Sequence, residues 1–204
     1  MNNADTSIFI VDDDIAVLDA LSLMLEQENF NVKSFENAED FLNNYQSTEK
    51  GCAIIDVRMP GMNGLDLQDT LLKQNILLPI IFLTGHGNIP MSVKAMKSGA
   101  IDFLTKPVTR EKLLSAVKAA IKESERLLIE NSHHQEALSH LAELTDRERD
   151  VMLLAVQGLA NKHIARQLGI SHRTVEIHKS KIMHKTGAEN LLDLARIVHE
   201  SGLN

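Results

Sequence analysis

Four short apolar runs in the first half of the chain each lead into a polar residue. Asp12 and Asp13 follow residues 8–11, Asp56 follows 52–55, Thr84 follows 79–83, and Lys106 comes just after 101–104. Apolar residues at helical spacing separate the runs, and such alternation predicts an α/β fold with a parallel, doubly wound sheet. Parallel strands share one carboxyl edge, where open α/β sheets bind ligands. The four runs therefore predict a reactive site at that edge.

Asp12, Asp13 and Asp56 would crowd three carboxylates together there. Carboxylates so close repel one another and take up protons unless a hard divalent cation that prefers oxygen, such as Mg2+, neutralises them. A carboxylate can also act as a nucleophile and form an aspartyl phosphate. If Asp56 is that nucleophile, the Lys106 ammonium and the Thr84 hydroxyl can contact the phosphoryl oxygens.

Each of these residues also has a structural alternative when it is taken singly. Asp13 or Asp14 can cap a helix, Thr84 can be an ordinary strand residue, and Lys106 can be a solvated loop charge. Independent caps and turns would not place a matched set after four separate strands. Together the residues favour the reactive site.

Two stretches around the candidate site have a recognisable pattern. They read Val57-Arg58-Met59-Pro60-Gly61-Met62 and Leu83-Thr84-Gly85-His86-Gly87. With the strand-end residues, they make the segment from Ser7 to about Lys122 resemble the receiver domain of a bacterial two-component response regulator, in particular of the FixJ branch. The alternation and size of the segment fit a five-stranded, flavodoxin-like sheet of strand order 2-1-3-4-5.

The resemblance assigns an expected role to each candidate residue. It implies that Asp56 is the phosphoacceptor, that Thr84 and Phe103 form a switch, and that Lys106 contacts the phosphoryl group. It also implies a Mg2+ site with the following oxygen donors: Asp13, Asp56, the backbone carbonyl of Arg58 and, through water, Asp12. His86 can tune hydrolysis of the phosphate or contact another domain, or it can simply be an exposed loop residue.

Composition sets the broad class of the protein. A chain of 204 residues suits one large domain or two small ones, and 44% hydrophobic with 24% charged residues is typical of a globular chain. No apolar stretch approaches the roughly 18 residues that span a bilayer, and residues 1–5 lack the basic start of a signal peptide. We therefore expect a cytoplasmic protein without a membrane partner. The one cysteine, Cys52, lies in a strand run and is expected to be a buried hydrophobe.

The formal net charge of -7 is unevenly distributed. Residues 1–122 have a net charge of -5, residues 123–141 of -3 and residues 142–204 of +1. Within the last segment, residues 159–187 contain six basic and one acidic residue, a net charge of +5. A local basic field of this kind is what contacts to nucleic-acid phosphates need, whatever the global charge. Aromatic residues make up only 3% of the chain, which argues against a stacking platform for single strands.

A linker is expected between two domains. The chain has no Pro or Gly between Pro107 and Gly158, and apolar residues recur at helical intervals, so the last receiver helix is expected to continue through about residue 136. An acidic, solvated helix is one interpretation, and a coiled-coil seam is the other. The expected domains are a receiver over residues 1–122, a helical linker over 123–143 and a third domain over 144–204.

The third domain has the pattern of a helix-turn-helix. Thr145 and Glu148 can form a capping box, and two short helices, opened by Asn161 and Ser171, are separated by Gly169 and Ile170. A Gly-containing turn between short helices is typical of DNA-binding motifs whose second helix enters the major groove. A last helix over residues 191–198 closes the bundle or pairs with a copy of itself.

Three stretches of this domain resemble the LuxR-type (NarL/FixJ) helix-turn-helix domain. They are Leu144-Thr145-Asp146-Arg147-Glu148, Gly158-Leu159-Ala160-Asn161-Lys162-His163-Ile164-Ala165 and Thr174-Val175-Glu176-Ile177-His178. The resemblance implies DNA contacts by Lys162, Arg173, Ile177, Lys179, Ser180, Lys181 and Lys185, with Lys162 as a phosphate clamp. Many relatives have lysine at the position of Glu176. Glu176 can read cytosine N4, or it can face solvent or pair within its helix, and Val175 and Ile182 are expected in the core.

Together these features predict a transcription regulator and not an enzyme. A sensor histidine kinase would phosphorylate Asp56, the receivers would form a homodimer, and the third domain would bind double-stranded DNA, with RNA polymerase as a further partner. One alternative is a phosphatase that works through an aspartyl phosphate, but such enzymes place the nucleophile after their first strand. The other alternative keeps the receiver and gives the last helices a protein or RNA target.

Overall fold

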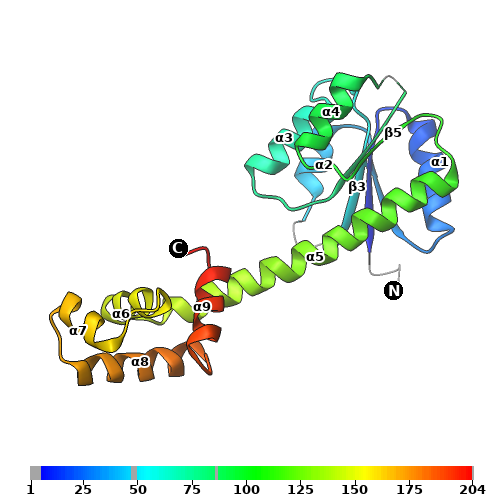
Figure 1. The fold of residues 1–204 in the computed structure, drawn as a ribbon. Coiled ribbons are helices and arrows are strands. Elements are labelled where there is room, and N and C mark those ends of the chain that lie inside the picture. Colours follow the sequence, from blue (N-terminus) through cyan, green and yellow to red (C-terminus); the bar gives the residue numbers. More distant parts are fainter. Residues whose placement is uncertain (1–5, 47–49, 86, 204) are drawn as a thin grey trace. The chain divides into compact units, whose positions relative to one another are not determined.

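The computed structural model describes residues 6–46, 50–85 and 87–203, so the predictions for residues 1–5 and His86 lie outside the described residues. The chain forms two compact units, residues 1–128 and 129–204 (Figure 1). The first contains strands β1 (Ser7–Val11), β2 (Asn31–Phe35), β3 (Gly51–Ile55), β4 (Ile80–Thr84) and β5 (Asp102–Thr105), with helices α1 (Ile15–Glu26), α2 (Ala38–Asn44), α3 (Gly64–Lys73) and α4 (Ile89–Lys97). Helix α5 (Arg110–Ala142) belongs to both units, and the second unit adds α6 (Asp146–Val156), α7 (Asn161–Leu168), α8 (His172–Thr186) and α9 (Leu191–Glu200).

The sheet of the first unit is parallel throughout and has the order β2-β1-β3-β4-β5. This confirms the predicted flavodoxin-like fold. Strands β1, β3 and β4 are buried along their whole length, because helices cover both faces of the sheet. In Figure 1, α1 and the first part of α5 lie on one face, and α2, α3 and α4 lie on the other.

Two apolar cores flank the sheet, one on each face. Successive side chains of a strand point to opposite faces, so Ile8 and Ile10 of β1 join the core beneath α1 and α5, whereas Phe9 and Val11 join the core beneath α2, α3 and α4. Cys52 is fully buried in β3, as predicted, and burial raises the pKa of its thiol to about 12.

Helix α5 is 33 residues long and continues without a break through the predicted linker. In the first unit, the Ser124 hydroxyl accepts the backbone N–H of Gly51 at 3.2 Å. In the second unit, Ala137 and Leu141 are buried in the core. The limits predicted for the linker stay a prediction. Among the described residues, no helix is both long and apolar enough to cross a membrane.

Gly64, the first residue of α3, packs directly against the end of β3. Its N–H donates to the carbonyl of Val57 at 3.0 Å, and a Cβ at this position would lie 2.2 Å from the backbone oxygen of Asp56. Asn63 caps the helix, and its side chain accepts the N–H groups of Leu65 and Asp66. Glycine is a poor helix former, so its presence here is not explained by helix propensity. Its lack of a side chain lets α3 approach the strand closely.

The second unit is a helical bundle around one core. The predicted capping box is confirmed, because Thr145 accepts the N–H of Glu148 and the Glu148 side chain accepts the N–H of Thr145. Gly169 ends α7 at a φ of 65°, a left-handed conformation that favours glycine and turns the chain into α8. Val175 and Ile182 are fully buried, as predicted.

One ion pair joins α6 to α8. The Glu148 side chain is buried, and its Oε2 atom lies 2.6 Å from Lys185 Nζ, which also donates to the backbone oxygen of Glu143 at 3.1 Å. The bond from Lys185, followed by the bond from the Thr145 N–H, lowers the pKa of Glu148 to about 2. Lys185, one of the predicted DNA contacts, therefore has a structural bond of its own.

We predict that Gly64→Ala destabilises the first unit by roughly 1–3 kcal/mol or more, because the added Cβ overlaps a backbone oxygen that no side-chain rotation can relieve. Tyr45 is the chain's one tyrosine, and there is no tryptophan, so urea unfolding followed by tyrosine fluorescence measures this unit alone. Gly85→Ala is the matched control, since a Cβ there meets nothing within 4 Å. Equal midpoints for both variants would contradict the packing argument.

We also predict that Glu148→Gln lowers the stability of the second unit by about 1–3 kcal/mol at pH 7, the cost of leaving a buried partner unsatisfied. The folded pKa of Glu148 lies below its ordinary value of 4.5, so the carboxylate stabilises the fold above that pH and loses its effect as the pH falls toward about 2. The difference between wild type and variant should therefore shrink across this window.

Urea unfolding followed by far-UV circular dichroism at pH 7 and pH 3 measures this difference, with tyrosine fluorescence to separate the first unit. Asp150→Asn is the control, because Asp150 lies exposed on the same helix. A difference that stays constant between the two pH values would contradict the assignment.

Candidate functional sites

The three predicted carboxylates meet at the carboxyl edge of the sheet. Strands β1 and β3 pair with Val11 opposite Ile55, so Asp12 and Asp56 leave neighbouring strands side by side. One carboxylate oxygen from each of Asp12, Asp13 and Asp56 lies within 4.8 Å of the others. Asp12 is 2% exposed and Asp56 8% exposed, whereas Asp13 is open to solvent. The cluster thus has two buried carboxylates, Asp12 and Asp56, and an exposed one, Asp13, at its rim.

Lys106 is the cation of this cluster. Its Nζ atom lies 2.5 Å from Asp12 Oδ2 and 3.7 Å from Asp56 Oδ2, and its backbone N–H donates to the carbonyl of Thr84 at 2.9 Å. Burial raises the pKa of Asp12 above its ordinary value of 3.8, while the bonds from Lys106 and from the Asp14 N–H oppose that rise. Three carboxylates face one ammonium, so the site has an excess of negative charge and only oxygen donors, which are the ligands that Mg2+ prefers.

Asp14 does not belong to the cluster. Its side chain accepts the N–H of Ala16 and caps α1. The structural alternative considered for Asp13 or Asp14 therefore applies to Asp14 alone.

Thr84 is the last residue of β4, and Phe103 lies in the neighbouring strand β5. Thr84 is fully buried at the end of β4, and the Phe103 ring packs on Phe82 with a centroid distance of 6.0 Å. A Cβ at Gly87 would lie 2.7 Å from Phe103 Cε1 and 3.3 Å from Thr84 Cγ2. A side chain at residue 87 would therefore force the Phe103 ring to shift.

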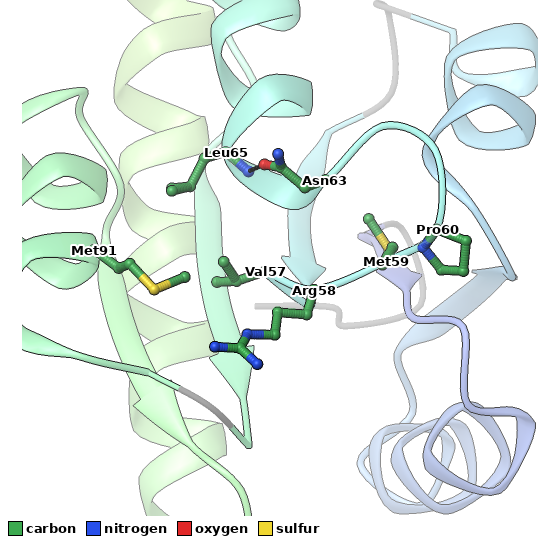
Figure 2. A pocket seen from close by; sticks show the side chains of 7 residues that line it. All are labelled: Val57, Arg58, Met59, Pro60, Asn63, Leu65 and Met91. Carbon is green, nitrogen blue, oxygen red and sulfur yellow. Dashed lines mark hydrogen bonds between the residues drawn. The ribbon is translucent and has the colours of Figure 1, made fainter.

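A pocket of about 390 Å3 lies beside the cluster and was not predicted from the sequence. It is lined by loop residues that follow Asp56, by the start of α3 and by the first turn of α4: Val57, Arg58, Met59, Pro60, Asn63, Leu65 and Met91 (Figure 2). Met91 points from α4 toward Val57, and Leu65 points into the same space from α3. The lining residues come from three separate segments, so no local pattern in the sequence signals the pocket.

The second candidate site is the exposed face of α8. Arg173, Ile177, Ser180 and Lys181 are exposed on this helix, and Lys162 is exposed at the start of α7. These five of the seven predicted DNA contacts are accessible. His184 lies on the same face, four residues beyond Ser180, and helical spacing could have added it to the predicted contacts.

The other two predicted contacts form bonds inside the unit. Lys179 donates to the side-chain oxygen of Asn161 at 3.0 Å, which joins α8 to α7, and Lys185 binds Glu148. Asn161 opens α7, as predicted, and Ala160 at the cap position before it makes no side-chain capping bond. His172 Nδ1 lies 3.5 Å from Glu176 Oε1, so Glu176 has a pairing partner within its own helix.

Two family models match the chain. Residues 8–118 match the response regulator receiver domain, and residues 142–198 match the luxR family of bacterial regulatory proteins. The response regulator protein TmoT of Ectopseudomonas mendocina is 43% identical over 97% of this chain and 90% of its own length. The transcriptional regulatory protein FixJ of Bradyrhizobium diazoefficiens is 38% identical over 96% of each chain.

Solved structures agree with these matches. The response regulator StyR has a TM-score of 0.81 and 38% identity, with 97% of this chain and 100% of that chain covered. Full-length FixJ from B. japonicum has a TM-score of 0.59 and 37% identity, with 98% and 99% covered. The phosphatase alternative finds no support in these relatives. The chain belongs to the response regulators that join a receiver domain to a LuxR-type DNA-binding domain, a family of transcription regulators and not of enzymes.

Proposed function

We propose that a sensor histidine kinase phosphorylates this response regulator on Asp56, and that the phosphorylated protein forms a homodimer and binds double-stranded DNA. The strongest support is the geometry around Asp56, which stands among carboxylate oxygens within 4.8 Å of one another and 3.7 Å from the Lys106 ammonium. In the transfer step, one Asp56 oxygen attacks phosphorus, the bond between phosphorus and the donor breaks, and the donor leaves with the bonding electrons.

The residues of the cluster have different proposed roles. Asp13, Asp56 and the Arg58 carbonyl would hold Mg2+, with Asp12 acting through water, and the ion would offset the charge between the carboxylates and the phosphoryl oxygens. Lys106 already bridges Asp12 and Asp56, so its ammonium can bind a phosphoryl oxygen on Asp56 with little movement.

Thr84 and Phe103 are the residues that we propose change position in response to the phosphoryl group. A ligand shifts a conformational equilibrium only through a difference in its interactions with the two states. Once a phosphoryl group is bound, the Thr84 hydroxyl can follow one of its oxygens, and the neighbouring Phe103 ring can move into the space that Thr84 leaves. Both side chains border the same position, Gly87, which supports this coupling.

The second unit would bind DNA through α8. We propose that Arg173, Ile177 and Ser180 face the base edges, and that Lys162 and Lys181 bind the phosphates. Lys179 and Lys185 would instead hold the helices of the unit together, because each ammonium already has a partner there. In this role the protein would act in the cytoplasm, and RNA polymerase would be a further partner.

Asp56→Asn should abolish labelling by acetyl phosphate in the presence of Mg2+, because an amide oxygen is too weak a nucleophile to form the acyl phosphate. Asp14→Asn is the control and should be labelled as the wild type is, since asparagine caps a helix as well as aspartate does. The measurement is the phosphate that hydroxylamine releases from the intact protein. Wild-type labelling of Asp56→Asn would sink the assignment of the phosphoacceptor.

Lys162→Ala or Lys181→Ala should weaken binding to specific and random duplexes alike and reduce the slope of log affinity against log salt by about one. Arg173→Ala should cost roughly 1–3 kcal/mol at a selected cognate site and much less on random duplex. Lys118→Ala, an exposed change in the first unit, should alter neither. If the phosphorylated protein shows no salt-dependent affinity for duplex DNA, a protein or RNA target replaces DNA.

A further inference from the structure

His178 lies at the boundary between the buried and the exposed sides of α8. Residues three or four apart share a side of a helix, so His178 has Val175 and Ile182 as neighbours toward the core, and both are fully buried. Lys181, three residues further along, is exposed, and His178 itself is partly exposed. The side chain of His178 therefore borders both the core of the bundle and its surface.

The two ring nitrogens of His178 differ in their surroundings. Nδ1 is buried and has no hydrogen-bond partner among the described residues. A proton on this atom would add a buried N–H donor without an acceptor, which is less favourable than an acceptor without a donor. This favours the neutral ring with its single proton on Nε2, the nitrogen at the outer end of the side chain.

The position of His178 on α8 suits a contact with the DNA backbone. A helix about 10–12 Å in diameter nearly fills a major groove about 12 Å wide, so side chains on its flanks meet the phosphates that line the groove. Ile177 lies at the centre of the exposed side and is 48% exposed. Lys181 lies about 40° round the helix from Ile177, and His178 about 100° in the same direction. His178 and Lys181 therefore share one flank.

Two other polar side chains of this flank already have partners within the second unit. The Thr174 hydroxyl lies 2.7 Å from Ser171 Oγ, and Lys185 Nζ lies 2.6 Å from Glu148 Oε2. A phosphate at this flank would therefore meet the Lys181 ammonium and the outer edge of the His178 ring.

We propose that His178 binds a phosphate of duplex DNA as a neutral donor: Nδ1 stays unprotonated against the bundle, and the Nε2–H donates to a phosphate oxygen. This inference rests on the proposed DNA binding by α8 and adds a residue to it. Unlike Lys181, such a donor brings no charge, so it contributes affinity without releasing a counterion. The contact is to the backbone and therefore does not distinguish one DNA sequence from another.

Three substitutions separate the donor from the shape of the ring. Gln places an amide N–H near the position of Nε2, Asn places one near the position of Nδ1, and Phe keeps a ring without a donor. In phosphorylated full-length protein, His178→Gln should bind duplexes within about twofold of wild type, whereas His178→Asn and His178→Phe should each lose at least about fivefold on cognate and random duplexes alike. His133→Phe, the same change at an exposed histidine of α5, should have no effect.

The salt dependence of binding tests the charge of the contact. The slope of log affinity against log salt should be the same for His178→Phe and wild type, because no cation is lost, whereas Lys181→Ala should lower it by about one. A slope that falls by about one in His178→Phe would overturn the neutral donor.

The protonation of the ring can be measured directly, which keeps the test independent of how well the variants fold. In 15N-histidine spectra of the full-length protein, the signal that is missing from His178→Gln belongs to His178. It should show the Nε2–H form in the free protein, and on addition of duplex its Nε2 should shift more than the ring nitrogens of His133. An Nδ1–H form, or an Nε2 that does not respond to duplex, would contradict the proposal.

These outcomes also separate the contact from the proposed function. If the wild type shows no salt-dependent affinity for duplex DNA, the proposed function fails and the contact fails with it. If the wild type and Lys181→Ala behave as expected and His178→Phe binds like the wild type, the proposed function stands, and His178 only packs at the edge of the core.

Discussion

Parallel hydrogen bonding between β1 and β3 places Val11 opposite Ile55, and the candidate phosphorylation site depends on this pairing. It brings Asp12 and Asp56 to the same edge, because each follows the last residue of its strand. It also divides the side chains of both strands between two separate cores. A slip of one residue would turn each apolar side chain to the wrong face and separate the two carboxylates. The fold is thus stable only in the register that assembles the site.

Two buried ionic sites within the described residues differ in their balance of charge. At the sheet edge, Asp12 and Asp56 share Lys106, and Asp13 adds a third carboxylate. The site therefore has an excess of negative charge that a bound cation or a phosphoryl group can change. In the second unit, Glu148 meets Lys185 one to one, with Thr145 as an additional donor. Such a pair is complete and holds helices together. The number of charges, as much as their burial, distinguishes a reactive site from a structural one.

Much of this could be predicted from the sequence, because strand-end polar residues and helical spacing are local signals. The strand order, the capping box at Thr145 and the buried Val175 and Ile182 are all confirmed. The partners of Lys179 and Lys185 could not be predicted, since each ammonium binds a residue on another helix. The pocket near Met91 likewise joins segments that are far apart in the sequence.

The three consecutive aspartates after β1 show how identical residues can become chemically distinct. Asp12 is buried against Lys106, Asp13 is exposed at the rim of the cluster, and Asp14 caps α1. Their positions differ by one backbone step each, yet a sequence aligned one residue out of place would still match aspartate with aspartate. Agreement in residue type along this stretch is therefore no guarantee of agreement in role. Only the strand pairing and the helix start, which fix the backbone on either side, tell the three carboxylates apart.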